Sequence, residues 1–109
     1  MACCDPNHQS DPSATAPANA GGATVTVVER KFQEFLQAAG APGALDAKTK
    51  QAIAIALSVL ARCEPCVKSH LKKARAMGFS QEEIDEAAWM GIGFGGSPTM
   101  VFYNSHRLK

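Results

Sequence analysis

Residues 52–61, AIAIALSVLA, form the most apolar segment of the chain. A polar first turn from about Asp46 precedes it, and no hairpin signal flanks it, so a helix is expected here rather than a strand. A helix that is apolar on nearly every side lies at the centre of a fold or between subunits. The segment therefore predicts a central helix, and because a small domain cannot cover all of it, a homo-oligomer.

The segments around this helix also have a helical period. One set of apolar residues recurs at helix spacing before the GAPG break at 40–43: Val28, Phe32, Phe35, Leu36 and Ala39. After the central helix, Pro65 favours a new helix start and Gly78 a helix end. The inner face of that helix is predicted to hold Val67, His70, Leu71 and Ala74.

Two further helices complete the expected fold. Ser80 and Glu83 have the spacing of a capping box, which predicts a helix from about residue 81. The glycine-rich stretch 93–98 is expected to interrupt it, and Ser97 to cap a last helix with Pro98 at its first position. No pair of strands is evident, so the predicted class is all-α.

The first 22 residues differ from the rest in composition. They contain no Leu, Ile, Val or aromatic residue but three prolines. Such a segment buries too little apolar area to offset the entropy of ordering it. We therefore predict a disordered tail over 1–22 and one helical domain over 23–109.

The overall composition excludes several classes of partner. A net charge of +1 gives no reason to expect a nucleic acid or a membrane surface. No run approaches the roughly 18 apolar residues of a membrane span, and the first residues do not form a secretory signal. A cytoplasmic location follows, where cysteine pairs are more often catalytic or metal-binding than structural.

The stretch RCEPCVKSH, residues 62–70, is the main candidate for chemistry. Two cysteines separated by two residues can form a disulfide where the backbone bends. Cys66 is predicted in the first turn of a helix, where free N–H groups favour a thiolate, so Cys63 is the expected resolving partner. His70 is four residues after Cys66, on the same helix face, and could transfer protons.

Other interpretations of these cysteines stay open. Cys63 and Cys66 could be core residues that pack as small hydrophobes. A zinc site would need a fourth ligand beyond this stretch, from His106, Cys3, Cys4 or His8. The adjacent thiols of Cys3 and Cys4 could also bind soft ions such as mercury or arsenic(III), alone or together with Cys63 and Cys66.

Residues 50–98 resemble the carboxymuconolactone decarboxylase superfamily, and most of all its alkylhydroperoxidase D-like branch. The shared pattern is an apolar helix, C-x-x-C-x-x-x-H, a following acidic helix start and a glycine-rich turn. The resemblance implies an all-helical fold that assembles as trimers or hexamers. It also implies that Cys66 reacts with a peroxide, that Cys63 closes the disulfide, and that His70 belongs to a proton relay.

Two positions depart from the pattern of that branch. Gln51 stands twelve residues before Cys63, where the family usually has a glutamate. Pro65 stands where the best-studied branch has a histidine. Glutamine can hydrogen-bond but cannot act as a base, so the relay of this chain lacks two titrating members.

These observations predict a thiol-dependent peroxidase or disulfide reductase with Cys66, Cys63, His70 and Gln51 as its site. A hydroperoxide or small disulfide is the expected substrate, and an external dithiol the reductant. No cofactor is expected. The stretch 91–98 follows a helix and not a strand, so it does not predict a phosphate loop or nucleotide binding. The alternatives are a soft metal or metalloid binding protein and a family scaffold without chemistry.

The remaining candidates have simpler interpretations. His106 is expected to be a solvated surface residue. Trp89, Met90 and Phe94 are expected in the core or in a subunit interface, where an apolar wall near Cys66 would suit an organic hydroperoxide. The cations at 68, 72, 73 and 75 are expected on a solvated helix face.

Overall fold

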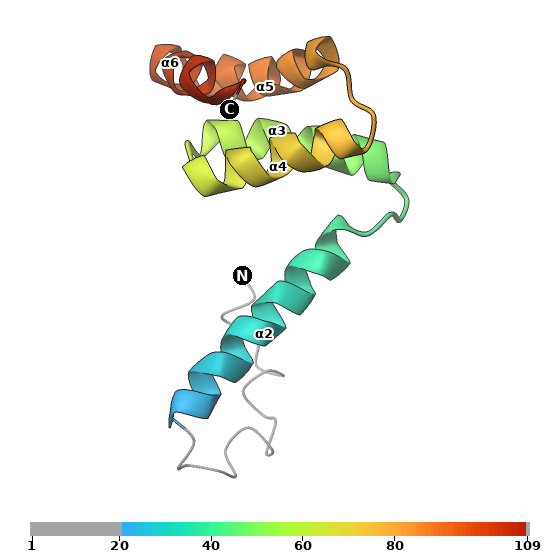
Figure 1. Ribbon diagram of the computed structural model, residues 1–109, viewed down its shortest axis with the longest axis vertical. Helices are drawn as coiled ribbons and strands as arrows, with labels where there is room; N and C mark the ends of the chain where they lie inside the picture. The colour runs from blue at the N-terminus through green and yellow to red at the C-terminus, as the bar shows by residue number, and fades with distance from the viewer. Residues whose placement is uncertain (1–20, 109) are drawn as a thin grey trace. The chain divides into compact units, whose positions relative to one another are not determined.

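The described part of the chain is helical throughout. The computed structural model describes residues 21–108 and forms no strand within that range. Its helices are α2 (Gly21–Gly40), α3 (Ala47–Leu60), α4 (Glu64–Ala76), α5 (Gln81–Gly95) and α6 (Ser97–His106) (Figure 1). The predicted all-α class is confirmed, and so is the position of the CxxC pair at a helix N-terminus.

Residues 21–39 of helix α2 belong to one compact unit of the chain, and residues 40–108 belong to the other. The helix begins at Gly21, and residues 1–20, most of the predicted tail, lie outside the described range. Its apolar side chains are exposed, with Phe32 53% and Phe35 59% accessible and their ring centroids 6.2 Å apart. This stripe is the amphipathic pattern that the sequence predicted.

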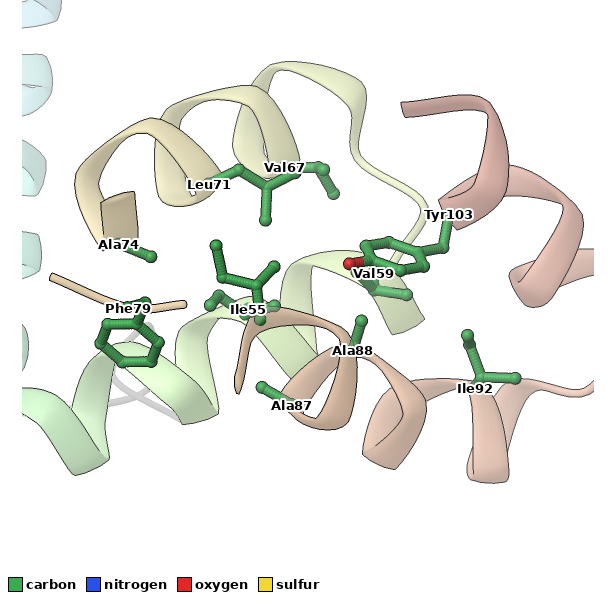
Figure 2. Packing of buried hydrophobic residues seen from close by; sticks show 11 residues of the cluster. Ile55, Val59, Val67, Leu71, Ala74, Phe79, Ala87, Ala88, Ile92 and Tyr103 are labelled. Carbon is green, nitrogen blue, oxygen red and sulfur yellow. The ribbon is translucent and has the colours of Figure 1, made fainter. Parts of the chain in front are cut away.

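Helix α3 is the centre of the second unit. Helices α4 and α5 both pack on α3, and α6 packs mainly on α5. The buried cluster between them is drawn in Figure 2 and comprises Ile55, Val59, Val67, Leu71, Ala74, Phe79, Ile84, Ala87, Ala88, Ile92 and Tyr103. Gly91 allows α5 to approach closely, because a Cβ there would overlap the carbonyl oxygen of Ala56.

The first turns of α3 and α5 have side-chain caps. The carboxylate of Asp46 accepts a hydrogen bond from the Thr49 N–H at 2.7 Å. Ser80 Oγ accepts from the Glu83 N–H at 3.0 Å, while the Glu83 carboxylate accepts from the Ser80 N–H at 2.9 Å. The predicted capping box is thus confirmed, and it fixes where α5 begins.

The last helix begins differently from the prediction. Helix α5 continues through Gly95, so only Gly96 interrupts the path into α6. Gly96 is the N-cap, with φ 81°, and makes no side-chain cap; Ser97 is the first helical residue. The prediction that Ser97 caps α6 was therefore wrong, because the left-handed backbone at Gly96 makes the turn one residue earlier.

A polar network connects the C-terminal residues to α5. Asp85 Oδ1 accepts hydrogen bonds from Tyr103 Oη at 2.6 Å, Gln81 Nε2 at 3.0 Å and Arg107 Nε at 3.1 Å. Arg75 of α4 donates to the Arg107 carbonyl oxygen at 2.7 Å. Because Tyr103 is 1% exposed, Asp85 satisfies a hydroxyl that would otherwise be buried without a partner.

Candidate functional site

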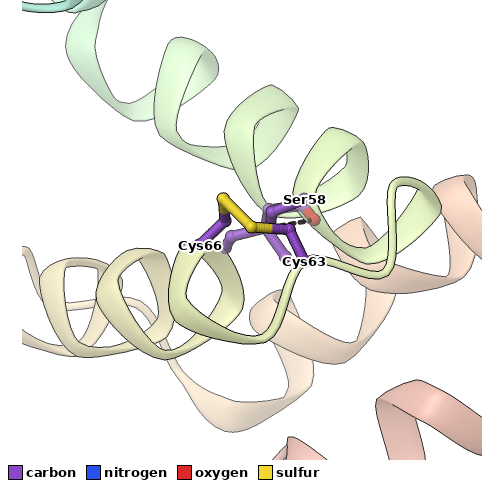
Figure 3. The surroundings of a disulfide bond; sticks show 4 residues. Ser58, Cys63 and Cys66 are labelled. Atoms are coloured by element: carbon purple, nitrogen blue, oxygen red, sulfur yellow. Dashed lines mark hydrogen bonds between the residues drawn. A yellow bond between two sulfur atoms is a disulfide. The ribbon is translucent and has the colours of Figure 1, made fainter.

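Cys63 and Cys66 are joined by a disulfide at the start of α4. Cys63 is the N-cap, with extended backbone angles, and Cys66 is the third residue of the helix. Their Cα atoms are 5.2 Å apart (Figure 3). The bend that brings them together comes from the passage between two helices, with Pro65 in the first turn of the second.

The backbone of Cys63 is bonded to both neighbouring helices. Its N–H donates to the carbonyl oxygen of Ser58 at 3.2 Å (Figure 3). Its own carbonyl oxygen accepts from the Val67 N–H at 2.9 Å. The first of these bonds completes the end of α3 and the second begins α4. The position of this sulfur is therefore set by the junction of two packed helices and not by a free loop.

The two sulfurs differ in their surroundings. Cys63 is half-buried, whereas Cys66 is exposed. Cys66 lies in the first turn of α4, where unpaired N–H groups and the helix dipole stabilise a negative charge. Glu64 is also in that turn, and its carboxylate is paired with Lys68 at 3.1 Å. The arrangement favours Cys66 as the thiolate that meets a reactant.

His70 follows Cys66 by one turn of the same helix and is half-buried. Burial lowers the pKa of its imidazole below the usual value, and the nearby Lys73 ammonium lowers the pKa further. The ring is thus neutral at neutral pH and has one N–H to donate.

Gln51 lies behind His70 and is 4% exposed. Its amide nitrogen donates to the His70 carbonyl oxygen at 2.9 Å and lies 3.4 Å from His70 Nδ1. A carbonyl oxygen can only accept, so the –NH2 group of Gln51 must face His70. Nδ1 then has to be the acceptor as well, which leaves the imidazole hydrogen on Nε2.

The contact from Gln51 to the backbone of His70 could not be inferred from the sequence. Spacing placed Cys66 and His70 on one helix face, but the Gln51 contact joins α3 to α4 and depends on how these helices pack. The structure thus brings Gln51 and His70 together, and it places Cys63 at the N-cap and Cys66 in the first turn of the helix that carries His70.

His106 differs from the expected solvated residue. Its side chain is only 16% exposed, and its Nε2 lies 3.8 Å from the Glu64 carboxylate. Its Nδ1 is 2.8 Å from the Phe102 carbonyl oxygen, and its ring centroid is 4.4 Å from that of Phe102. The prediction for this residue was wrong because α6 folds back toward the start of α4.

The metal-binding interpretation has no support in the described residues. Across 21–108 there is no group of three His, Cys, Asp or Glu side chains arranged to hold a metal ion. Cys3, Cys4 and His8 lie outside the described range.

Trp89, Met90 and Phe94 are outside the core, at 50%, 64% and 84% exposed. They do not pack in the core, because the α3 face of α5 is occupied by smaller residues such as Ala88 and Gly91. Their expected place in a subunit interface stays a prediction. Trp89 and Met90 instead border a surface pocket of about 690 Å³ together with Phe79 and Lys48. Neither cysteine lines that pocket.

No helix within 21–108 has the length and apolar character needed to cross a bilayer.

Comparison with known proteins gives consistent results. The model of the carboxymuconolactone decarboxylase family matches residues 27–103. Uncharacterized protein 4 in the cox locus of Paracoccus denitrificans is 35% identical over 81 residues, which are 74% of this chain and 73% of that protein. An uncharacterized protein of Cupriavidus necator is 34% identical over 71 residues, 65% of this chain and 63% of its own length.

A solved structure shares the fold. A crystal structure of a Thermotoga maritima protein superposes with a TM-score of 0.69 at 31% identity, and the match covers 73% of this chain and 82% of that one. That Thermotoga maritima protein is described as a carboxymuconolactone decarboxylase family protein, and a role in an antioxidative response has been suggested for it.

Proposed function

This chain belongs to the carboxymuconolactone decarboxylase family, and from that premise we propose that it is a thiol oxidoreductase whose Cys63–Cys66 pair cycles between dithiol and disulfide. The oxidant is a hydroperoxide or a small disulfide, and an external dithiol is the reductant. The proposal rests above all on one observation: Cys63 and Cys66 are joined by a disulfide at the start of α4, and Cys66 is exposed whereas Cys63 is half-buried.

The oxidative half of the cycle has two steps. The Cys66 thiolate attacks the terminal oxygen of a hydroperoxide, so the O–O bond breaks and Cys66 becomes a sulfenic acid while an alcohol leaves. The Cys63 thiol then attacks the sulfenic sulfur, which forms the disulfide and releases water. With a small disulfide as oxidant, Cys66 forms a mixed disulfide first and Cys63 displaces the second thiol.

We propose that His70 donates a hydrogen bond to the leaving alkoxide, which takes its proton from solvent. Its neutral imidazole carries hydrogen on Nε2, because Gln51 donates to the other side of the residue. An N–H donor suits the departing oxygen better than a base would. Without a glutamate at position 51, activation of Cys66 relies on the helix N-terminus, and we expect a slower peroxidase than one with a complete relay.

The setting of the enzyme is part of the proposal. We place it in the cytoplasm, where external dithiols can restore both cysteines.

We also propose a homo-oligomer, a trimer or a hexamer. The support is the apolar area that one copy leaves exposed, including Leu57, Phe94 and Val101 at 59%, 84% and 60%. Sedimentation equilibrium measures the number of subunits.

Chemical trapping tests the assignment of roles. In C63S, treatment with cumene hydroperoxide should leave a sulfenic acid on Cys66, which dimedone labels and mass mapping locates. In C66S, the same treatment for the same time should leave Cys63 unlabelled, because Cys63 is half-buried and is the N-cap residue. Equal labelling of the two variants would contradict the assigned roles, and labelling of C66S alone would reverse them.

A further inference from the structure

The charges of the second unit are divided between two helices. Residues 62–75, which include the cysteine pair, contain five basic side chains and one acidic one. Helix α5 contains four acidic side chains and no basic one, at Glu82, Glu83, Asp85 and Glu86. Although the net charge is only +1, the chain is positive around its disulfide and negative along α5.

The positive residues beside the cysteines are open to a partner. Arg62, Lys72 and Lys73 are exposed and form no ion pair within 21–108, whereas Lys68 is paired with Glu64. We name these four cations, Arg62, Lys68, Lys72 and Lys73, the α4 basic surface. Arg75 is not included, because its guanidinium binds the Arg107 carbonyl oxygen and Gln81.

The spacing of the cations relates them to the reactive sulfur. Arg62 directly precedes Cys63 in the chain. Lys73 is seven residues after Cys66, so Lys73 and Cys66 lie on the same face of α4, two turns apart. The helix rises roughly 14 Å between Glu64 and Lys73. A small dithiol does not span that distance, whereas a polypeptide that reaches Cys66 would lie along it.

We infer that the α4 basic surface docks a protein dithiol whose cysteines are flanked by Asp and Glu residues, and that this protein is the reductant. The inference rests on the proposed function, since it names the partner of the same disulfide. Opposite charge would steer the approach and orient the partner, with little effect on the chemistry of the sulfurs themselves.

The exchange that follows is balanced without another reactant. A partner thiolate attacks the sulfur of Cys66, the exposed residue of the pair, which breaks the Cys63–Cys66 bond and releases the Cys63 thiolate. The second partner thiol, deprotonated, attacks its own sulfur in the mixed disulfide and releases the Cys66 thiolate at the helix N-terminus. The partner leaves as a disulfide, and its two protons end on the two cysteines or in solvent.

Two synthetic peptides test the inference on the full chain. Both carry the same pair of cysteines, which are flanked by aspartates in one peptide and by lysines in the other. At about 20 mM salt, the acidic peptide should reduce the Cys63–Cys66 disulfide about tenfold faster than the basic peptide, and at 0.5 M salt the difference should fall below about twofold. Equal rates at low salt would overturn the inference.

Charge-matched variants locate the effect. K72Q/K73Q should cut the low-salt preference for the acidic peptide to about threefold or less. K48Q/K50Q removes the same charge from the first turn of α3, at the end of that helix away from the cysteines, and should keep the full preference. If the two double variants behave alike, the effect comes from net charge and the α4 basic surface is not a docking site.

Dithiothreitol, which is uncharged, separates this inference from the proposed function. Each peptide rate is divided by the dithiothreitol rate of the same variant, so any effect of Lys73 on His70 cancels. If hydroperoxides do not form the disulfide but its reduction is faster with the acidic peptide, the peroxidase cycle is contradicted and the docking surface is supported. If hydroperoxides form the disulfide but the two peptides reduce it equally fast, the peroxidase cycle is supported and the docking surface is contradicted.

Discussion

Gln51 determines which nitrogen of His70 carries its hydrogen. The amide donates to the backbone carbonyl of His70 at 2.9 Å and faces Nδ1 at 3.4 Å. Because the carbonyl can only accept, the amide cannot turn to present its oxygen without losing a buried hydrogen bond. The imidazole is therefore held as a neutral donor at Nε2, a state that burial and Lys73 favour by lowering its pKa.

Replacing Gln51 by glutamate should reverse this state. In Q51E the carboxylate faces Nδ1, and a negative charge beside an imidazole favours its protonated form, so the pKa of His70 should rise by about one unit or more. The titration of the His70 ring protons, followed by NMR, measures it. Q51M is the control, since it removes the hydrogen bonds without adding charge. A pKa in Q51E equal to that of Q51M would contradict the account.

The turns after α3 and α4 have the same hydrogen-bond pattern but different residues. After α3, the N–H groups of Arg62 and Cys63 donate to the carbonyls of Val59 and Ser58 at 3.0 and 3.2 Å. After α4, Gly78 and Phe79 make the equivalent bonds. The residue in the left-handed conformation is Arg62 at φ 52° in one turn and Gly78 at φ 94° in the other.

This difference predicts opposite effects of two substitutions. R62G should raise the free energy of unfolding by about 0.5 to 1 kcal/mol, because the left-handed conformation disfavours a residue with a Cβ. G78A should lower it by about 1 to 2 kcal/mol for the same reason. No atom lies within 4 Å of a Cβ at Gly78, so a clash would not contribute. Urea unfolding measures both changes, and a destabilised R62G would contradict this explanation.

Helix boundaries could be predicted where a local residue sets them. Pro65 and the Ser80–Glu83 capping box act within one turn, and the structure has α4 and α5 starting beside them. The turn at Arg62 could not be predicted, because an arginine carries no signal for a left-handed backbone. The start of α6 was predicted one residue too late, because both Gly96 and Ser97 are suitable N-cap residues. Which of them is the N-cap depends on the backbone conformation at Gly96, which the sequence does not specify.

At the scale of the whole molecule, the acidic network on Asp85 holds the last helix in place. Hydrogen bonds from Arg107 lower the pKa of the Asp85 carboxyl more than its partial burial raises it, and Tyr103 and Gln81 lower the pKa further. A carboxyl whose pKa is lower when folded stabilises the protein above its unfolded pKa of about 3.9. That stability is lost as the pH falls through the lower, folded value.

Removing the charge of Asp85 should therefore matter at neutral pH and not in acid. D85N should lower the free energy of unfolding by about 1 to 2 kcal/mol at pH 7, since the hydrogen bonds of Tyr103 and Arg107 lose a charged acceptor. The difference from the wild type should shrink as the pH falls below about 4. E86Q, an exposed carboxyl of the same helix, should change stability by less than about 0.5 kcal/mol. A constant D85N deficit down to pH 2 would contradict this.

The sequence could not separate the core from the outer surface of α5. Trp89, Met90 and Phe94 are large and apolar, which predicts burial, but close packing of α5 on α3 requires small residues on the facing side. The candidate site shows the same limit. The positions of Cys63, Cys66 and His70 along α4 could be predicted from their spacing. The contacts of Gln51 and of His106 join separate helices, so they could be identified only from the packing of those helices.

The most direct test of the central claim is the rate at which the reduced protein forms the Cys63–Cys66 disulfide. A small excess of cumene hydroperoxide is added, the reaction is quenched at successive times, and mass mapping follows the bond. We expect a specific Cys63–Cys66 bridge that forms at least about a hundredfold faster than free cysteine is oxidised under the same conditions. A rate no greater than that of free cysteine would mean that hydroperoxide is not the oxidant of this chain.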